Sequence, residues 1–140
     1  GGQAALRLAY RHPDKFPIAA AIAPAIDFHL GMRHGHDWAD GELFDTLWEI
    51  FDEPEQARQE TAILHVHPLN WPRHQWLVSS SNDARWHDGA VRLSSKLIAL
   101  GIPHTAILDE NTHEDLVSAF ADDAISFIMK SLEAEARRVS

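Results

Sequence analysis

The feature that most constrains the fold is the alternation of short apolar runs with longer amphipathic stretches in the second half of the chain. The run 74–80 ends in a polar loop, 81–88, and apolar residues at helical spacing then continue to a stop at Gly101. A second apolar run, 105–108, is followed by another loop and by a last helical stripe over 116–128. Strands that alternate with helices build a parallel sheet with helices on its faces, so we predict an α/β fold.

The first half opens with the pattern of a short helix followed by a buried strand. Ala and Leu favour a helix over residues 2–12, and Pro13 ends it. The apolar run between Pro17 and Pro24 is short and bracketed by prolines, which is typical of a strand buried on both faces.

The stretch 27–73 differs from the rest of the chain because it is rich in His and Trp and shows no strand-like alternation. Asp40 is a candidate N-cap, and Pro54 can begin a second short helix. The amphipathic stripe after Asp40 consists of Leu43, Phe44, Leu47, Trp48 and Phe51. We expect a helical excursion outside the sheet and a polar tail, 133–140, that frays at the end of a single domain.

Composition and charge exclude several classes of function. Hydrophobic residues make up 45% of the chain and charged residues 24%, which are ordinary values for a globular protein. The 12 Lys and Arg stand against 21 Asp and Glu, so the formal net charge is -9 and no nucleic-acid partner is expected. No apolar run reaches the roughly 18 residues of a membrane span. The absence of Cys rules out disulfides, thiolate metal sites and a Cys nucleophile.

Polar residues follow each expected strand, at the ends where functional groups gather in open parallel sheets. Asp27 and His29 follow the first strand, Asn82 and Asp83 the second, and residues 111–115 the third. An Asp and a His on neighbouring strand ends can meet in space, and a carboxylate bonded to one imidazole nitrogen leaves the other free as a general base.

Asp83 and His113 are the pair best placed for this chemistry. They are 30 residues apart, which leaves room for one loop, one helix and one strand between them. The alternative is that Asp83 only caps a turn and that His113 is an ordinary loop residue, because both types are common in loops.

The opening segment, 1–16, reads GGQAALRLAYRHPDKF and resembles the stretch after the nucleophile elbow of α/β-hydrolases. The similarity is greatest to the esterase group that includes S-formylglutathione hydrolases, in which G-x-S-x-G-G precedes such a helix. Residues 23–27 resemble the strand end that follows, 81–86 the acid loop, and 100–104 the link before the histidine. The resemblance covers essentially the whole chain.

This resemblance implies the C-terminal half of a serine esterase that hydrolyses a small carboxylic ester or thioester without a cofactor. Asp83 would be the triad acid and His113 the base, and the nucleophilic Ser would lie two residues before Gly1, outside this chain. The 140-residue chain alone should then be inactive. The strand between Pro17 and Pro24 would also lack the neighbouring strand that leads into the nucleophile, which leaves an exposed sheet edge through which the chain could self-associate. The histidine loop of the family usually contains two glycines, which this chain replaces with Asn111 and Thr112.

Several alternatives remain open at this point. Asp27 and Asp88 could supply the acid instead of Asp83, and Trp86 could line an acyl or leaving-group pocket. A hydrolase-fold protein that has lost catalysis and binds a ligand is a second functional class. A His-rich metal module is a third, with the candidate ligands His29, His34, His36, His65 and His67.

Overall fold

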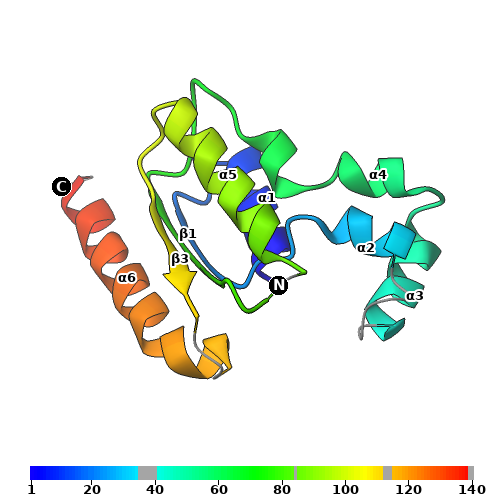
Figure 1. Cartoon of the computed structure of the whole chain (residues 1–140). Coiled ribbons are helices and arrows are strands. Elements are labelled where there is room, and N and C mark those ends of the chain that lie inside the picture. The colour runs from blue at the N-terminus through cyan, green and yellow to red at the C-terminus, as the bar shows by residue number, and fades with distance from the viewer. Residues whose placement is uncertain (35–40, 84, 112–114, 139–140) are drawn as a thin grey trace.

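The computed structural model of this protein describes residues 1–34, 41–83, 85–111 and 115–138. Three strands, β1 (Ile18–Ile22), β2 (His74–Ser80) and β3 (Thr105–Glu110), form one parallel sheet in the order β1-β2-β3 (Figure 1). The predicted α/β architecture with a parallel sheet is confirmed. Within the described residues, no helix combines the length and hydropathy that crossing a membrane requires.

Helices cover both faces of this sheet. The helices α1 (Gly2–Arg11) and α5 (His87–Ala99) pack on one face, and α6 (Leu116–Arg138) packs on the other. Side chains alternate along β2, so that Leu77 faces α1 and α5 whereas Trp76 faces α6. Because β2 is the central strand, almost all of its residues are buried.

The chain between β1 and β2 forms a helical lobe beside the sheet, which is visible on the right of Figure 1. The lobe consists of α2 (Phe28–His34), α3 (Gly41–Ile50) and α4 (Pro54–Arg58), and the 3-10 helix η2 (Ala62–His65) that follows packs against α1, with Ala62 in the core of the sheet. The expected helical excursion is therefore confirmed. The candidate N-cap Asp40 lies outside the described residues.

An apolar cluster joins this lobe to the loop after β2. Its buried members are Phe28, Met32, Ala57 and Trp86, and Leu47 and Phe51 of the α3 stripe pack against them. Trp86 thus comes from the second half of the chain but packs among lobe residues. This contact fixes the position of the lobe relative to the carboxyl edge of the sheet.

Two boundaries differ from the sequence prediction. The helix α5 begins at His87, inside the expected polar loop 81–88. The helix α6 continues to Arg138, beyond residue 133, where the sequence predicts the start of a polar tail. Glu135 ties this part of α6 to the residue before β2, because its carboxylate accepts hydrogen bonds from Arg73 Nε at 2.7 Å and Arg73 Nη2 at 3.0 Å. The adjacent Arg73 guanidinium also lowers the pKa of Glu135.

Candidate functional site

The carboxyl ends of the three parallel strands meet at one edge of the sheet, and α1 begins beside it. A Cβ atom added to Gly2 would lie 3.2 Å from Ala21 Cβ and 3.4 Å from Pro24 Cα. The first turn of α1 is therefore packed closely on the end of β1. Exposed backbone N–H groups of a first helical turn favour negative charge nearby.

The chain leaves β1 through a strained turn. Ala23 has a φ of 50°, and its N–H donates to the Val78 carbonyl oxygen at 2.8 Å. A left-handed conformation costs a non-glycine residue about 1–2 kcal/mol, and such strain is concentrated at functional edges of folds. The turn leads residues 24–27 away from the sheet and into the lobe.

The loops that follow β2 and β3 are hydrogen-bonded to each other. Ser81 donates to the Glu110 carbonyl oxygen from its N–H at 2.8 Å and from its Oγ at 3.1 Å. Asn82 Nδ2 donates to the carbonyl oxygen of Asn111. These bonds lie just beyond a register shift between Val78 and Ser80, where β3 carries one extra residue. The loops that contain Asp83 and His113 therefore start side by side.

Asp83 lies at the edge of the site with one carboxylate oxygen occupied. Its Oδ1 accepts the N–H of Arg85 at 3.2 Å and lies 3.6 Å from Arg85 Nε. Its carbonyl oxygen accepts the N–H of His87 at 3.1 Å, so the residue caps the turn into α5. The side chain is 23% exposed. A carboxylate offers about four acceptor sites, so these contacts leave capacity for a further donor.

His113, the proposed base, lies outside the described residues. Asn111 and Asp115, each two residues away from it along the chain, are the nearest described residues of the loop. The distance between the Asp83 carboxylate and the His113 ring is thus a prediction rather than an observation.

Asp27, an alternative acid, has a different environment. Its side chain is buried, with only 5% exposed, and Oδ1 accepts a hydrogen bond from Arg92 Nη2. The other oxygen, Oδ2, would lie only 2.8 Å from a Cβ added to Gly89. Asp27 is therefore enclosed between α5 and the turn after β1. Asp88, the other alternative, is exposed in the first turn of α5.

Sequence reasoning missed a contact between Ser79 and His87. Ser79 Oγ lies 3.1 Å from His87 Nδ1, and the serine residue is 1% exposed. A serine this deeply buried cannot reach a substrate, so the contact anchors the first turn of α5 to β2. The sequence offers no distinct signal for it, because Ser79 is one of several polar residues in β2.

A largely apolar cavity of about 530 Å³ lies beside the first turn of α1. Its residues come from α1, the turn after β1, the lobe and the segment before η2, and they are Gly1, Gln3, Ala4, Arg7, Ala25, Phe28, Leu47, Phe51 and Glu60. The Phe28 and Phe51 ring centroids are 6.1 Å apart and form one wall. Arg7 and Glu60 form an ion pair at the opposite, polar side.

Gln3 links α1 to residues 60–62 through two hydrogen bonds beside the cavity. Its Nε2 donates to the Glu60 carbonyl oxygen at 3.1 Å, and its Oε1 accepts the Ala62 N–H at 3.0 Å. Trp86, expected at a pocket wall, packs in the apolar cluster that also contains Phe28. The cavity and the loop that carries Asp83 are thus connected through one buried side chain.

The candidate metal ligands are not assembled in the part of the chain that the structure describes, where no group of three His, Asp or Glu residues could hold an ion. His65 Nε2 is hydrogen-bonded to the Gln59 carbonyl oxygen at 3.1 Å. His67 Nδ1 accepts the Leu69 N–H at 3.0 Å. His36 and the side chain of His34 lie outside the described residues.

Comparison with known proteins adds no further constraint on the site. No family model, no curated protein and no solved structure matches the chain, so its function has to be inferred from the residues and geometry described above.

Proposed function

We propose that this chain is part of a serine hydrolase that cleaves small carboxylic esters or thioesters. In this proposal Asp83 is the acid and His113 the base of a triad whose Ser precedes Gly1. No cofactor takes part. The proposal rests on the resemblance of the sequence to α/β-hydrolases and on the arrangement of the carboxyl edge.

The observation that best supports it is the hydrogen bonding between the loops after β2 and β3. Asn82, the neighbour of Asp83, donates to Asn111, which is two residues from His113. Consecutive Cα atoms are about 3.8 Å apart, so chain connectivity keeps His113 within about 8 Å of Asn111. Both residues of the proposed pair thus belong to loops that start in direct contact.

In the proposed reaction the serine hydroxyl attacks the acyl carbon and His113 accepts its proton. His113 then passes that proton to the leaving alcohol or thiol as the acyl-enzyme forms. Asp83 holds the imidazole in one tautomer and stabilises the imidazolium. A water molecule next attacks the acyl-enzyme, giving its proton to His113, and the released serine takes the proton back.

The cavity beside α1 favours an apolar acyl or leaving group. Its walls include Ala4, Ala25 and Phe28, and it lies at the first turn of the helix that would follow the nucleophile. Apolar walls with a few polar groups at one side are the usual form of a small-molecule site. The Arg7–Glu60 pair would then mark where the apolar part of the site ends and a polar part of the substrate begins.

A catalytically inactive binding protein is the second candidate. One observation favours it, namely that Asp83 already caps a turn through Arg85 and His87. The same cavity would then hold a ligand that is not turned over.

The residues encoded before Gly1 distinguish the two candidates. The hydrolase requires a Ser two positions before Gly1, and the chain extended to include it should hydrolyse p-nitrophenyl acetate and react covalently with a fluorophosphonate. The 140-residue chain should show no acyl-enzyme burst. Another residue at the Ser position, or an extended chain that neither turns over the ester nor reacts with the probe, would favour the binding protein.

A further inference from the structure

A second cavity, of about 230 Å³, lies between α5 and the segment that contains α4 and η2. It shares no lining residue with the cavity beside α1. It is lined by Asp27, His29, Arg58, Thr61, Ile63, Leu64, Arg92 and Lys96. Three of the 12 Lys and Arg of an acidic chain therefore meet at one small hollow, against a single carboxylate.

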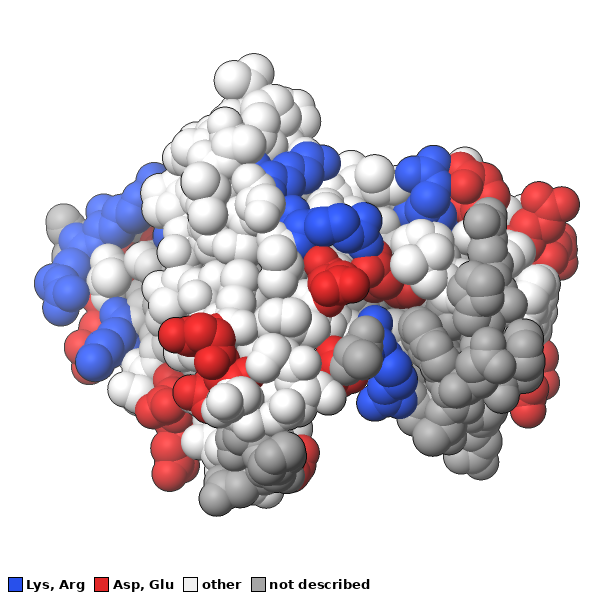
Figure 2. All heavy atoms as spheres, in the orientation of Figure 1, with Lys and Arg blue, Asp and Glu red and all other residues white. Residues whose placement is uncertain are grey.

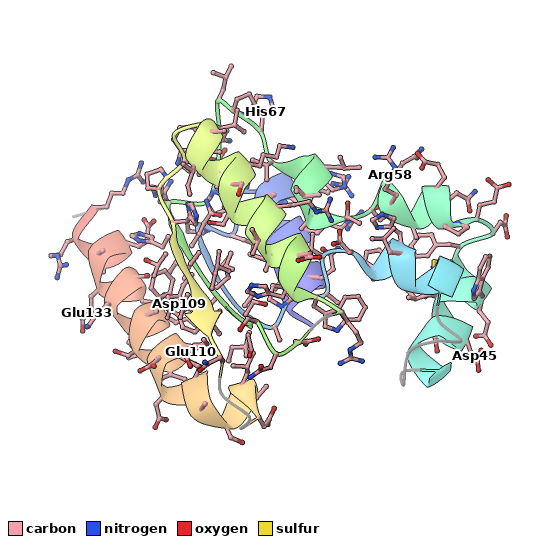
Figure 3. All side chains as sticks on the ribbon, viewed as in Figure 1. Asp45, Arg58, His67, Asp109, Glu110 and Glu133 are labelled. Atoms are coloured by element: carbon pink, nitrogen blue, oxygen red, sulfur yellow. The ribbon has the colours of Figure 1, made fainter. Side chains whose placement is uncertain are left out.

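The three cations reach the cavity from two elements. Arg92 and Lys96 are one turn apart on α5, so their side chains share a helix face. Arg58 comes from α4 on the opposite side and is labelled in Figure 3. Figure 2 shows Lys and Arg side chains gathered over α5 and α4 on this face of the molecule.

The contacts of these cations leave donors for a ligand. Arg92 uses Nη2 for Asp27, and its side chain remains 54% exposed. A guanidinium has five N–H donors, so most of those of Arg92 remain for other acceptors. Lys96 Nζ donates to the Ile63 carbonyl oxygen at 2.6 Å, and this neutral acceptor does not cancel its charge.

Arg58 uses more of its N–H donors within the protein than Arg92 does. It contacts the Glu55 carboxylate through Nε at 2.8 Å and Nη2 at 2.6 Å. Its side chain is nevertheless 45% exposed beside the hollow. Arg58 therefore contributes peripheral donors while Glu55 balances its charge, and Arg92 and Lys96 provide the other donors.

We propose that this cavity binds a small dianion, specifically a phosphate group, either as the free ion or as a phosphomonoester. Arg offers paired donors that match phosphate oxygens, and Lys adds a point charge. Asp27, the carboxylate in the lining, is paired with Arg92 and lies buried, and Arg58 is paired with Glu55, so Lys96 carries the net positive charge of the group. The proposal does not depend on hydrolase activity, because it uses none of the triad residues.

The test is a titration of the 140-residue protein with inorganic phosphate and, separately, with glycerol 3-phosphate. Backbone and Arg side-chain NMR signals are followed at constant ionic strength. We expect saturable shifts at the cavity, and Lys96→Gln should weaken binding about fivefold or more. Arg58→Gln, at a more exposed position, should weaken it less. Tighter binding of the ester would identify a phosphorylated small molecule, and binding of inorganic phosphate alone would identify the free ion.

Lys130→Gln is the matched control, because it removes the same charge from an exposed position on α6. It should leave phosphate affinity unchanged. Thermal unfolding followed by circular dichroism checks that each variant is folded. Shifts that do not saturate, or equal weakening by Lys96→Gln and Lys130→Gln, would show only general charge attraction and would overturn the proposal.

Discussion

Asp27 and Asp83 follow neighbouring strands of one sheet, yet their surroundings are opposite. Asp27 is buried, ion-paired to Arg92, and pressed against the first turn of α5. Asp83 is partly exposed, and its carboxylate contacts Arg85 of its own turn. A position at a strand end therefore does not by itself identify a catalytic acid.

The difference indicates what each carboxylate can do. The Asp27–Arg92 contact ties the turn after β1 to α5, so moving Asp27 toward a substrate would break a buried pair. In the proposed triad, Asp83 would offer its second oxygen to the ring of His113 from the neighbouring loop. This comparison favours Asp83 as the acid and assigns Asp27 a structural role.

The largest expected effect is on turnover of the chain extended to include its serine. Asp83→Asn should lower kcat on the order of 10⁴-fold, because the imidazole loses the carboxylate that fixes its tautomer. Asp27→Asn should lower kcat by less than about tenfold if its role is structural. Ester hydrolysis under saturating substrate measures both.

Asp109→Asn is the control for these variants, since Asp109 is exposed on β3 and far from the lobe (Figure 3). It should leave kcat unchanged. His113→Ala should lose on the order of 10³-fold or more. A large loss in Asp27→Asn with a small one in Asp83→Asn would reverse the assignment.

The second effect concerns stability and separates the two ion pairs. Arg92→Met leaves the buried Asp27 carboxylate without its partner and should lower the free energy of unfolding by about 2–3 kcal/mol. Arg85→Met removes an exposed partner of Asp83 and should cost less than about 1 kcal/mol. Urea denaturation of both variants measures the two losses of unfolding free energy. Equal losses would show that the Asp27–Arg92 pair contributes no more stability than the Asp83–Arg85 pair.

The third effect tests how closely α5 approaches Asp27. Gly-to-Ala changes inside helices usually stabilise by about 1 kcal/mol. Gly89→Ala should instead destabilise by about 1–3 kcal/mol, because the new Cβ would lie 2.8 Å from Asp27 Oδ2 and 3.0 Å from Ile26 Cβ. Gly1→Ala, where nothing lies within 4 Å, is the control for the substitution. A stabilised Gly89→Ala protein would mean that α5 lies farther from the turn.

The smallest effect involves Glu135, a carboxylate that is paired like Asp27 but at the opposite end of the sheet. Arg73 lowers its pKa in the folded protein, so its contribution is present above the unfolded pKa and is lost as pH falls through the folded one. Glu135→Gln should therefore reduce the helicity at the end of α6 near neutral pH. The variant should then show no further loss of this helicity as the pH falls. Circular dichroism from neutral to acidic pH measures this. An unchanged acid transition in the variant would exclude Glu135 as its cause.

The sequence predicts the elements whose own pattern is strong. β2, β3 and most of α6 follow from periodicity, and the end of α1 follows from Pro13. Elements held by distant contacts could not be predicted. The short helix α2 contains glycine and histidines and has no clear periodicity, but Phe28 and Met32 pack against Ala57 and Trp86.

The same reason explains what was missed in the site. Gly89 lies just after the expected loop 81–88 and carries no signal of its own in the sequence, whereas it is where α5 closely approaches Asp27. The Asp27–Arg92 pair joins residues 65 apart and the Arg73–Glu135 pair residues 62 apart, and no local pattern announces either contact. The predicted strand order puts Asp83 at the carboxyl edge of the sheet. Only the structure shows that Asp83 is partly exposed whereas Asp27 is buried.

The most direct test of the central claim is the tautomer of His113 in the 140-residue protein. Nitrogen NMR of the neutral imidazole distinguishes protonation at Nδ1 from protonation at Nε2. A carboxylate partner selects the Nδ1–H form, so the protein should show that form, and Asp83→Ala should shift it toward the Nε2–H form while Asp88→Ala should not. The account would be contradicted if His113 kept the same tautomer in folded Asp83→Ala protein, because Asp83 would then not be its partner.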